Sequence, residues 1–174
     1  MIFTLNKSLE ILKNTPEVLT TMLRHISRDW TEAKEEENKW SVKDVIAHLI
    51  ICEKTNWIVR AEIILSEASE KKFTPIDMTA HFELSQNNSL EKLLEEFFVI
   101  REKNIHTLKD YKLKETDFSK TAVHPKLGAV NLSQLLATWV AHDLSHMAQV
   151  SRIMAKQCKE QVGPFVEFLS IMNK

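Results

Sequence analysis

Two histidines stand four residues apart in the strongest helical pattern of the sequence, a spacing that could bind a metal ion. His142 and His146 lie one turn apart on one helix face, because each residue rotates by about 100°. Two buried imidazoles without partners cost free energy, and one divalent metal ion would satisfy both. The apolar stripe that leaves a gap at this pair consists of Leu132, Leu135, Leu136, Trp139, Val150, Ile153 and Met154.

A third histidine strengthens the metal hypothesis. The pair alone is not specific, since core and surface histidines have the same spacing. His48 lies in another helical pattern beside Val45 and Leu49, where a solvated histidine would be out of place. Two alternatives stay open: His48 could be a core histidine bonded to a carbonyl, and the three histidines could form a core without metal.

Several other side chains could take part in such a site. Cys52, one turn after His48, could be a ligand or a reactive thiol, although a small buried hydrophobe is the favoured interpretation. Asp143 could orient a ligand imidazole or be a surface charge, and Glu53 could be a general base or a salt-bridge residue. His124 could lie at the open end of a bundle, but a loop histidine without a role is favoured. Residues interpreted as core or unremarkable are Trp40, Trp57 (which could also line a pocket), Trp139, His25, His81 and His106.

Several other chemistries lack their motifs. The sequence has no Gly-rich phosphate loop, no serine nucleophile elbow and no paired glutamate motif of di-iron bundles. These absences restrict the prediction to the chemistry of one metal ion, and no catalytic residue beyond the ligands is assigned.

Composition favours a single helical domain. The 174 residues include only two glycines and four prolines, whereas β-sheet proteins usually need more turn residues. A hydrophobic content of 44% suits an ordinary globular core. We therefore predict one all-α domain over residues 1–174.

Charge and cysteine content exclude other classes of protein. Lys and Arg total 23 against 24 Asp and Glu, so the chain has no basic stripe for nucleic acid. Two cysteines make no disulfide framework, and no apolar run approaches the ~20 residues of a membrane span. No secretory signal is evident at the start. We expect a cytoplasmic protein that binds neither nucleic acid nor membrane.

Cap signals place four long helices. Thr15 and Pro16 resemble a helix start, so a helix is predicted after a short lead-in turn within residues 3–27. Ser41 with Asp44 and Asn131 with Gln134 resemble capping boxes that open helices reaching about residues 65 and 156. The remaining long helix is predicted to begin at Asn88 and to contain Leu90 to Leu108.

Two long connections complete the predicted architecture. Residues 66–88 lack helical periodicity, and residues 111–130 contain a turn at His124–Gly128 that suggests a small hairpin. A short terminal helix is predicted over Phe165–Met172. The pattern predicts a four-helix bundle with long connections and a short C-terminal helix.

Two of these segments resemble the DinB-like metal-binding four-helix bundles, a family named for DNA-damage-inducible members. The resemblance is strongest in Trp40–Leu49 and Leu135–His146, and it extends from about Asn14 over nearly the whole chain. The His124–Gly128 turn and the Gln157–Pro164 tail are similar to one branch of the family.

The resemblance implies a ligand set and an activity. In this family one histidine from the second helix and two from the fourth hold the metal, positions filled here by His48, His142 and His146. Related proteins include metal-dependent transferases and isomerases that use thiols such as mycothiol or bacillithiol, and members often form homodimers. We therefore expect a mononuclear enzyme with thiol-transferase or hydrolase chemistry on a small molecule.

The identity of the metal and the use of the site stay open at this point. Three histidines with an open coordination position suit zinc, nickel, iron or cobalt. The alternative to an enzyme is a non-catalytic bundle in which the ion only stabilises the fold.

Overall fold

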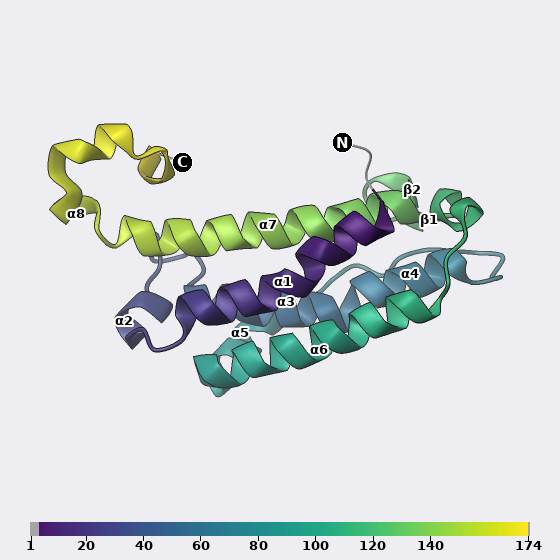
Figure 1. The fold of residues 1–174 in the computed structure, drawn as a ribbon, viewed down its shortest axis with the longest axis horizontal. Coiled ribbons are helices and arrows are strands. Elements are labelled where there is room, and N and C mark those ends of the chain that lie inside the picture. The colour runs from purple at the N-terminus through teal and green to yellow at the C-terminus, as the bar shows by residue number, and fades with distance from the viewer. Residues whose placement is uncertain (1–3, 174) are drawn as a thin grey trace.

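Four long helical segments lie side by side and form the body of the molecule (Figure 1). The computed structural model describes residues 4–173. The segments are α1 (Leu5–Leu23), α3 (Val42–Thr55) with α4 (Trp57–Leu65), α6 (Leu90–Asp110) and α7 (Leu132–Lys156). Helix α1 packs on α6 and α7, and α3 packs on the same two helices. The predicted all-α four-helix bundle is confirmed.

Two capping boxes open the helices that carry the three histidines. The Ser41 hydroxyl accepts from the Asp44 amide at 3.1 Å, and Asp44 Oδ2 accepts from the Ser41 amide at 2.9 Å. Asn131 and Gln134 make the same reciprocal pair at 2.8 and 2.9 Å. Each pair satisfies amides that a helix start leaves free, so both predicted starts are confirmed.

The predicted start of the first helix is wrong, because α1 runs through Pro16 from an N-cap at Thr4. Thr15 does not cap anything; its hydroxyl donates to the Ile11 carbonyl at 3.0 Å. Proline has no N–H for the Leu12 carbonyl one turn earlier. Arg101 Nη1 donates to that carbonyl at 2.8 Å instead. A tertiary hydrogen bond thus offsets part of the cost of a proline inside the helix.

Three further boundaries differ from the sequence prediction. The second long helix is interrupted at Asn56, which separates α3 from α4. Helix α6 is capped by Ser89 instead of Asn88, with the Ser89 hydroxyl accepting from the Lys92 amide at 3.3 Å. The connection after α4 contains a helix, α5 (Ala80–Asn87), which packs on α3.

The remaining elements lie at the ends of the bundle (Figure 1). Strands β1 (Thr121–His124) and β2 (Gly128–Asn131) form the antiparallel hairpin that the turn suggested, with Gly128 at φ 74°. The C-terminal segment is less regular than one helix: α8 (Lys159–Val162) is followed by 3₁₀ turns at Gly163–Phe168 and Ser170–Asn173. The short α2 (Arg28–Thr31) follows α1.

The core consists of two apolar clusters, and the candidate site lies between them. One cluster contains Cys52, Trp57 and Trp139, and the other contains Leu49 and Val150. On α7, His142 and His146 lie between Val140 of the first cluster and Val150 of the second, and on α3 His48 lies one turn before Cys52. Among residues 4–173, no helix is both long and apolar enough to cross a membrane.

Candidate metal centre

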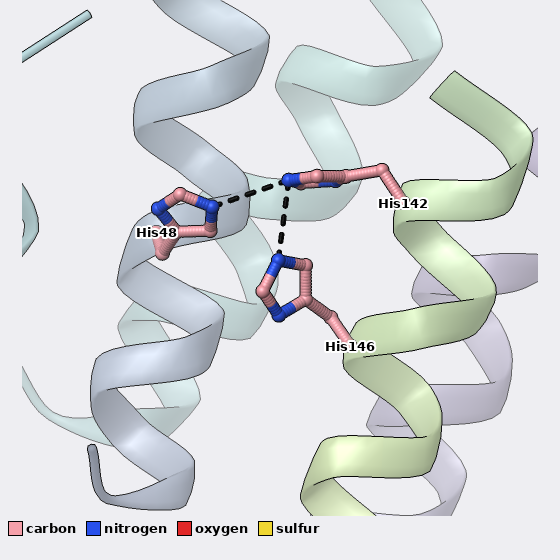
Figure 2. A group of neighbouring side chains, drawn as sticks. All are labelled: His48, His142 and His146. Carbon is pink, nitrogen blue, oxygen red and sulfur yellow. Dashed lines mark hydrogen bonds between the residues drawn. The ribbon is translucent and has the colours of Figure 1, made fainter. Parts of the chain in front are cut away.

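The structure brings His48, His142 and His146 together between α3 and α7 (Figure 2). The Nε2 atom of His142 lies 3.2 Å from that of His48 and 3.1 Å from that of His146. One nitrogen from each ring falls within 4.8 Å of the other two. His48 is buried, and the two histidines of α7 are partly exposed.

Hydrogen bonding alone does not account for this arrangement, whereas three nitrogens around one metal ion would be consistent with it. A ring nitrogen carries either one hydrogen or one lone pair in the ring plane, so His142 Nε2 cannot serve both neighbours well. Nitrogens bound to one tetrahedral zinc ion at 2.0–2.1 Å would lie about 3.4 Å apart, close to the observed contacts. The donor set therefore fits a divalent metal ion.

The surroundings keep these rings in the form that binds metals. Burial lowers the pKa of both His48 and His142 to about 3, and the neighbouring histidines act in the same direction. Burial also lowers the pKa of His146. The rings are consequently neutral at pH 7, each with a lone pair to offer.

Gln149 orients one of the three rings, a role that the sequence analysis missed. His146 Nδ1 lies 2.8 Å from Gln149 Oε1, one helical turn away on α7. An amide oxygen only accepts, so Nδ1 carries the hydrogen and Nε2 keeps its lone pair for the site. The three-residue spacing of His146 and Gln149 was the available signal.

Aromatic side chains enclose the histidines. The Trp40 ring centre lies 4.8 Å from that of His48 and 6.2 Å from that of His146, while Trp57 lies 5.0 Å from His142. Trp57 is a buried core residue that stacks on Trp139, yet it also forms one wall of the site. A surface pocket of about 430 Å³ reaches the site beside Trp40 and His146.

Cys52 touches the site directly. Its Sγ atom lies 3.5 Å from His48 Nε2 and 3.8 Å from His142 Nε2. Burial raises the pKa of the thiol to about 12, so the uncharged thiol predominates in the metal-free protein. The favoured interpretation as a buried hydrophobe is right about its burial, but Cys52 also contacts two of the candidate ligands.

Asp143 and Glu53 belong to a buried ionic network behind the site. Both carboxylates are buried, and Arg101 binds them, so they do not orient a ligand imidazole. Arg101 binds both oxygens of Asp143 at 2.6 and 3.0 Å and Glu53 Oε1 at 2.8 Å. Trp139 Nε1 and Asn104 Nδ2 also donate to the Glu53 carboxylate, at 3.0 and 2.9 Å. The salt-bridge interpretation of Glu53 therefore agrees with the structure.

Burial and the ion pairs act in opposite directions on the pKa values of Glu53 and Arg101. Burial raises the pKa of Glu53 although Arg101 opposes the shift. Burial alone would lower the pKa of Arg101, but the two carboxylates raise it above the ordinary value. Arg101 thereby joins α6 to α3 and α7 beside Cys52 and His142, and sequence analysis missed it because its partners lie more than 40 positions away.

Comparison with known proteins decides the family. The model of the DinB superfamily matches residues 11–150. The chain belongs to the DinB superfamily. The resemblance noted in the sequence is thereby confirmed, together with the bundle that it implied.

One solved structure supports the fold of this DinB member. It is the structure of YfiT from Bacillus subtilis, described as "a probable metal-dependent hydrolase with an unusual four-helix bundle topology". The TM-score is 0.74 at 18% identity, over 87% of this chain and 86% of that one. At this identity the match establishes the shared fold alone. Among curated proteins, none matches the chain.

The remaining histidines of this DinB member have different surroundings. His124 lies in the hairpin, where its Nδ1 accepts from the Lys126 and Leu127 amides, and its ring contacts Phe73. His106 is exposed on α6 and pairs with Asp110. His81 is buried beside His48, although the sequence gave no reason to single it out.

Proposed function

We propose that the chain binds one divalent metal ion through His48, His142 and His146 and uses it to act on a small molecule. The observation that carries the proposal is the convergence of three Nε2 atoms from two helices. Three protein ligands leave a coordination position free, as in catalytic metal sites. Zinc, nickel, iron and cobalt all suit three imidazoles, and availability decides among them.

The reaction proposed is attack of a water or a low-molecular-weight thiol on a small electrophile. When bound, the ion supplies Lewis acidity and lowers the pKa of a water or thiol beside it. The protein supplies neutral imidazoles, aromatic walls and a pocket next to His146 through which a small molecule can enter. The description of YfiT as a probable metal-dependent hydrolase supports the hydrolytic form of the reaction.

The thiol form of the proposal and the homodimer rest on the family resemblance, whereas the cytoplasmic location rests on the composition of the sequence. The apolar wall formed by Trp40 and Trp57 suits a small molecule with an apolar part. A screen of small thiols and esters with metal-loaded protein would detect the proposed activity. Turnover that disappears on chelation and returns on adding metal would support it.

A structural metal site is the second candidate, and Cys52 is the observation that favours it. Its sulfur lies 3.5 and 3.8 Å from two of the ligand nitrogens, distances that suit a common metal ion. A fourth protein ligand would close the site, as in structural zinc centres. Cys52 Sγ nevertheless makes no such contact with His146, which favours the open site.

Spectra of the cobalt-loaded protein separate the two candidates. We expect Cys52→Ser to leave the visible spectrum unchanged. Its metal affinity should stay within about threefold of that of the unsubstituted protein, because three imidazoles supply most of the binding. The unsubstituted protein should show no sulfur-to-cobalt charge-transfer band. That band should appear when 2-mercaptoethanol is added, which provides the positive control.

A different pattern would favour the structural site. A charge-transfer band in the unsubstituted protein that disappears in Cys52→Ser would show that Cys52 is a ligand. Collapse of the far-UV circular dichroism spectrum on chelation would point the same way. An intact metal-free fold together with a thiol-induced band would support the proposed function.

A further inference from the structure

His81 is a buried polar side chain next to the candidate site, and its ring makes no hydrogen bond to the described residues. Only 1% of it is exposed, and neither Nδ1 nor Nε2 has a partner among the described residues. Each unsatisfied buried polar group costs about 1–3 kcal/mol, so native proteins rarely keep one without a use. An apolar side chain at this position would avoid the cost.

The fold holds His81 in place against a candidate ligand. Ser85, one turn after His81 on α5, donates to the carboxylate of Asp44, which lies one turn before His48 on α3. Burial alone would raise the pKa of Asp44, but hydrogen bonds from Ser85 and Ser41 lower it, so the carboxylate stays charged. The antiparallel helices therefore align two pairs of residues: Ser85 with Asp44, and His81 with His48.

The ring contacts of His81 include one of the three histidines, His48. Its ring centre lies 5.7 Å from that of His48 at an interplanar angle of 86°. Trp40 lies 4.3 Å from His81 and 4.8 Å from His48, so one indole covers both rings. Phe82 packs beside His81 at 4.0 Å. His81 is thus enclosed with the site, although it lies outside the group of three converging nitrogens.

We propose that His81 is a binding residue of this site, where its ring hydrogen-bonds the small molecule that enters beside the three histidines. The inference rests on the proposed function and adds a fourth imidazole to it. An imidazole offers one N–H and one lone pair. Such a group selects ligands in which one atom approaches the metal position and a neighbouring atom is anionic or carries a lone pair. Azide and hydroxythiols are examples.

The alternative is a histidine that merely fills space, and it predicts different effects for the same substitutions. If His81 only fills space, Phe at this position should leave ligand binding unchanged. If His81 binds the ligand, Phe should weaken the ligand while the metal and the fold are unaffected. Because an unsatisfied polar group is removed, the metal-free His81→Phe protein should unfold at the same temperature or higher.

The test is an azide titration of the cobalt-loaded protein, followed by visible absorption. We expect His81→Phe to raise the dissociation constant for azide roughly tenfold or more, as for loss of one hydrogen bond to an anion. His81→Gln keeps a hydrogen-bond donor, so its dissociation constant for azide should lie between those of the unsubstituted protein and His81→Phe. Cobalt affinity, measured with a competing chelator, should stay within about threefold in both variants, since His81 is not among the three ligands.

The outcomes distinguish this inference from the proposed function. Azide binding within twofold of the unsubstituted protein in both variants would overturn the role of His81 and leave the metal site standing. A large loss of thermal stability in both variants would also overturn it, in favour of a structural role. If the unsubstituted protein binds cobalt but no azide, the open coordination position fails, and the proposed function fails with it.

Discussion

Replacing His142 by alanine is expected to abolish stoichiometric metal binding while the bundle stays folded. His142 Nε2 is the nitrogen within 3.2 Å of both other candidate ligands, so its loss removes the centre of the group. Loss of a ligand should weaken metal binding by more than about 100-fold, since loss of an outer hydrogen-bond partner alone costs 10–100-fold. Competition with a chromogenic chelator measures the affinity.

A histidine away from the site provides the matched control. His106 on α6 has 78% of its side chain exposed, and His106→Ala should bind metal as the unsubstituted protein does. Circular dichroism should show the same helical content in both variants. Unchanged metal uptake by His142→Ala would contradict the assignment and favour a histidine core without metal.

Replacing Arg101 by methionine is expected to destabilise the fold more than any substitution at the histidines. Only 1% of the Arg101 side chain is exposed, and it neutralises the buried carboxylates of Glu53 and Asp143. Removing one partner of a buried ionic network typically costs about 3–5 kcal/mol, because the remaining charges stay unpaired. The hydrogen bond to the Leu12 carbonyl before Pro16 is lost as well. Urea unfolding of the metal-free protein measures the difference.

An exposed arginine and a compensated variant make this test specific. Arg28 has 84% of its side chain exposed in its pair with Glu32, and Arg28→Met should leave the unfolding midpoint unchanged. Adding Glu53→Gln and Asp143→Asn to Arg101→Met should recover part of the lost stability, because both unpaired charges are removed. A loss of less than about 1 kcal/mol in Arg101→Met would contradict the network as a determinant of stability.

The network also explains how the bundle positions the site. Glu53 follows Cys52 on α3, and Asp143 follows His142 on α7. Arg101 on α6 binds both carboxylates and so fixes the two ligand-bearing helices relative to each other. For this reason we expect folded Arg101→Met protein to bind metal more weakly than the unsubstituted protein.

Local patterns in the sequence were sufficient for most of the fold. The capping boxes at Ser41 and Asn131 were correct because their hydrogen bonds join residues three positions apart. The structure also places His142 and His146 on one face of α7, as their spacing predicted, because one helical turn sets this geometry. Spacing could not join His48 to this pair, because 94 positions separate it from His142 and only the tertiary fold brings them together.

The errors came from interactions between distant residues. Pro16 resembled a helix start because the sequence does not show that Arg101 satisfies the carbonyl it leaves free. Asp143 neither orients a ligand nor lies on the surface, because Arg101 on α6 binds it, whereas the salt-bridge alternative for Glu53 was right. His81 was passed over because its helix has little periodicity, and only packing against α3 places it beside His48.

Elemental analysis of protein produced without a polyhistidine tag, combined with X-ray absorption at the edge of the metal found, shows whether the three histidines hold one metal ion. We expect one divalent ion per chain with three imidazole nitrogens at about 2.0–2.1 Å and one further light ligand. The ion should be lost in His142→Ala and retained in His106→Ala. Protein that contains no stoichiometric metal and takes none up when supplied with zinc, nickel, iron or cobalt would contradict the metal site.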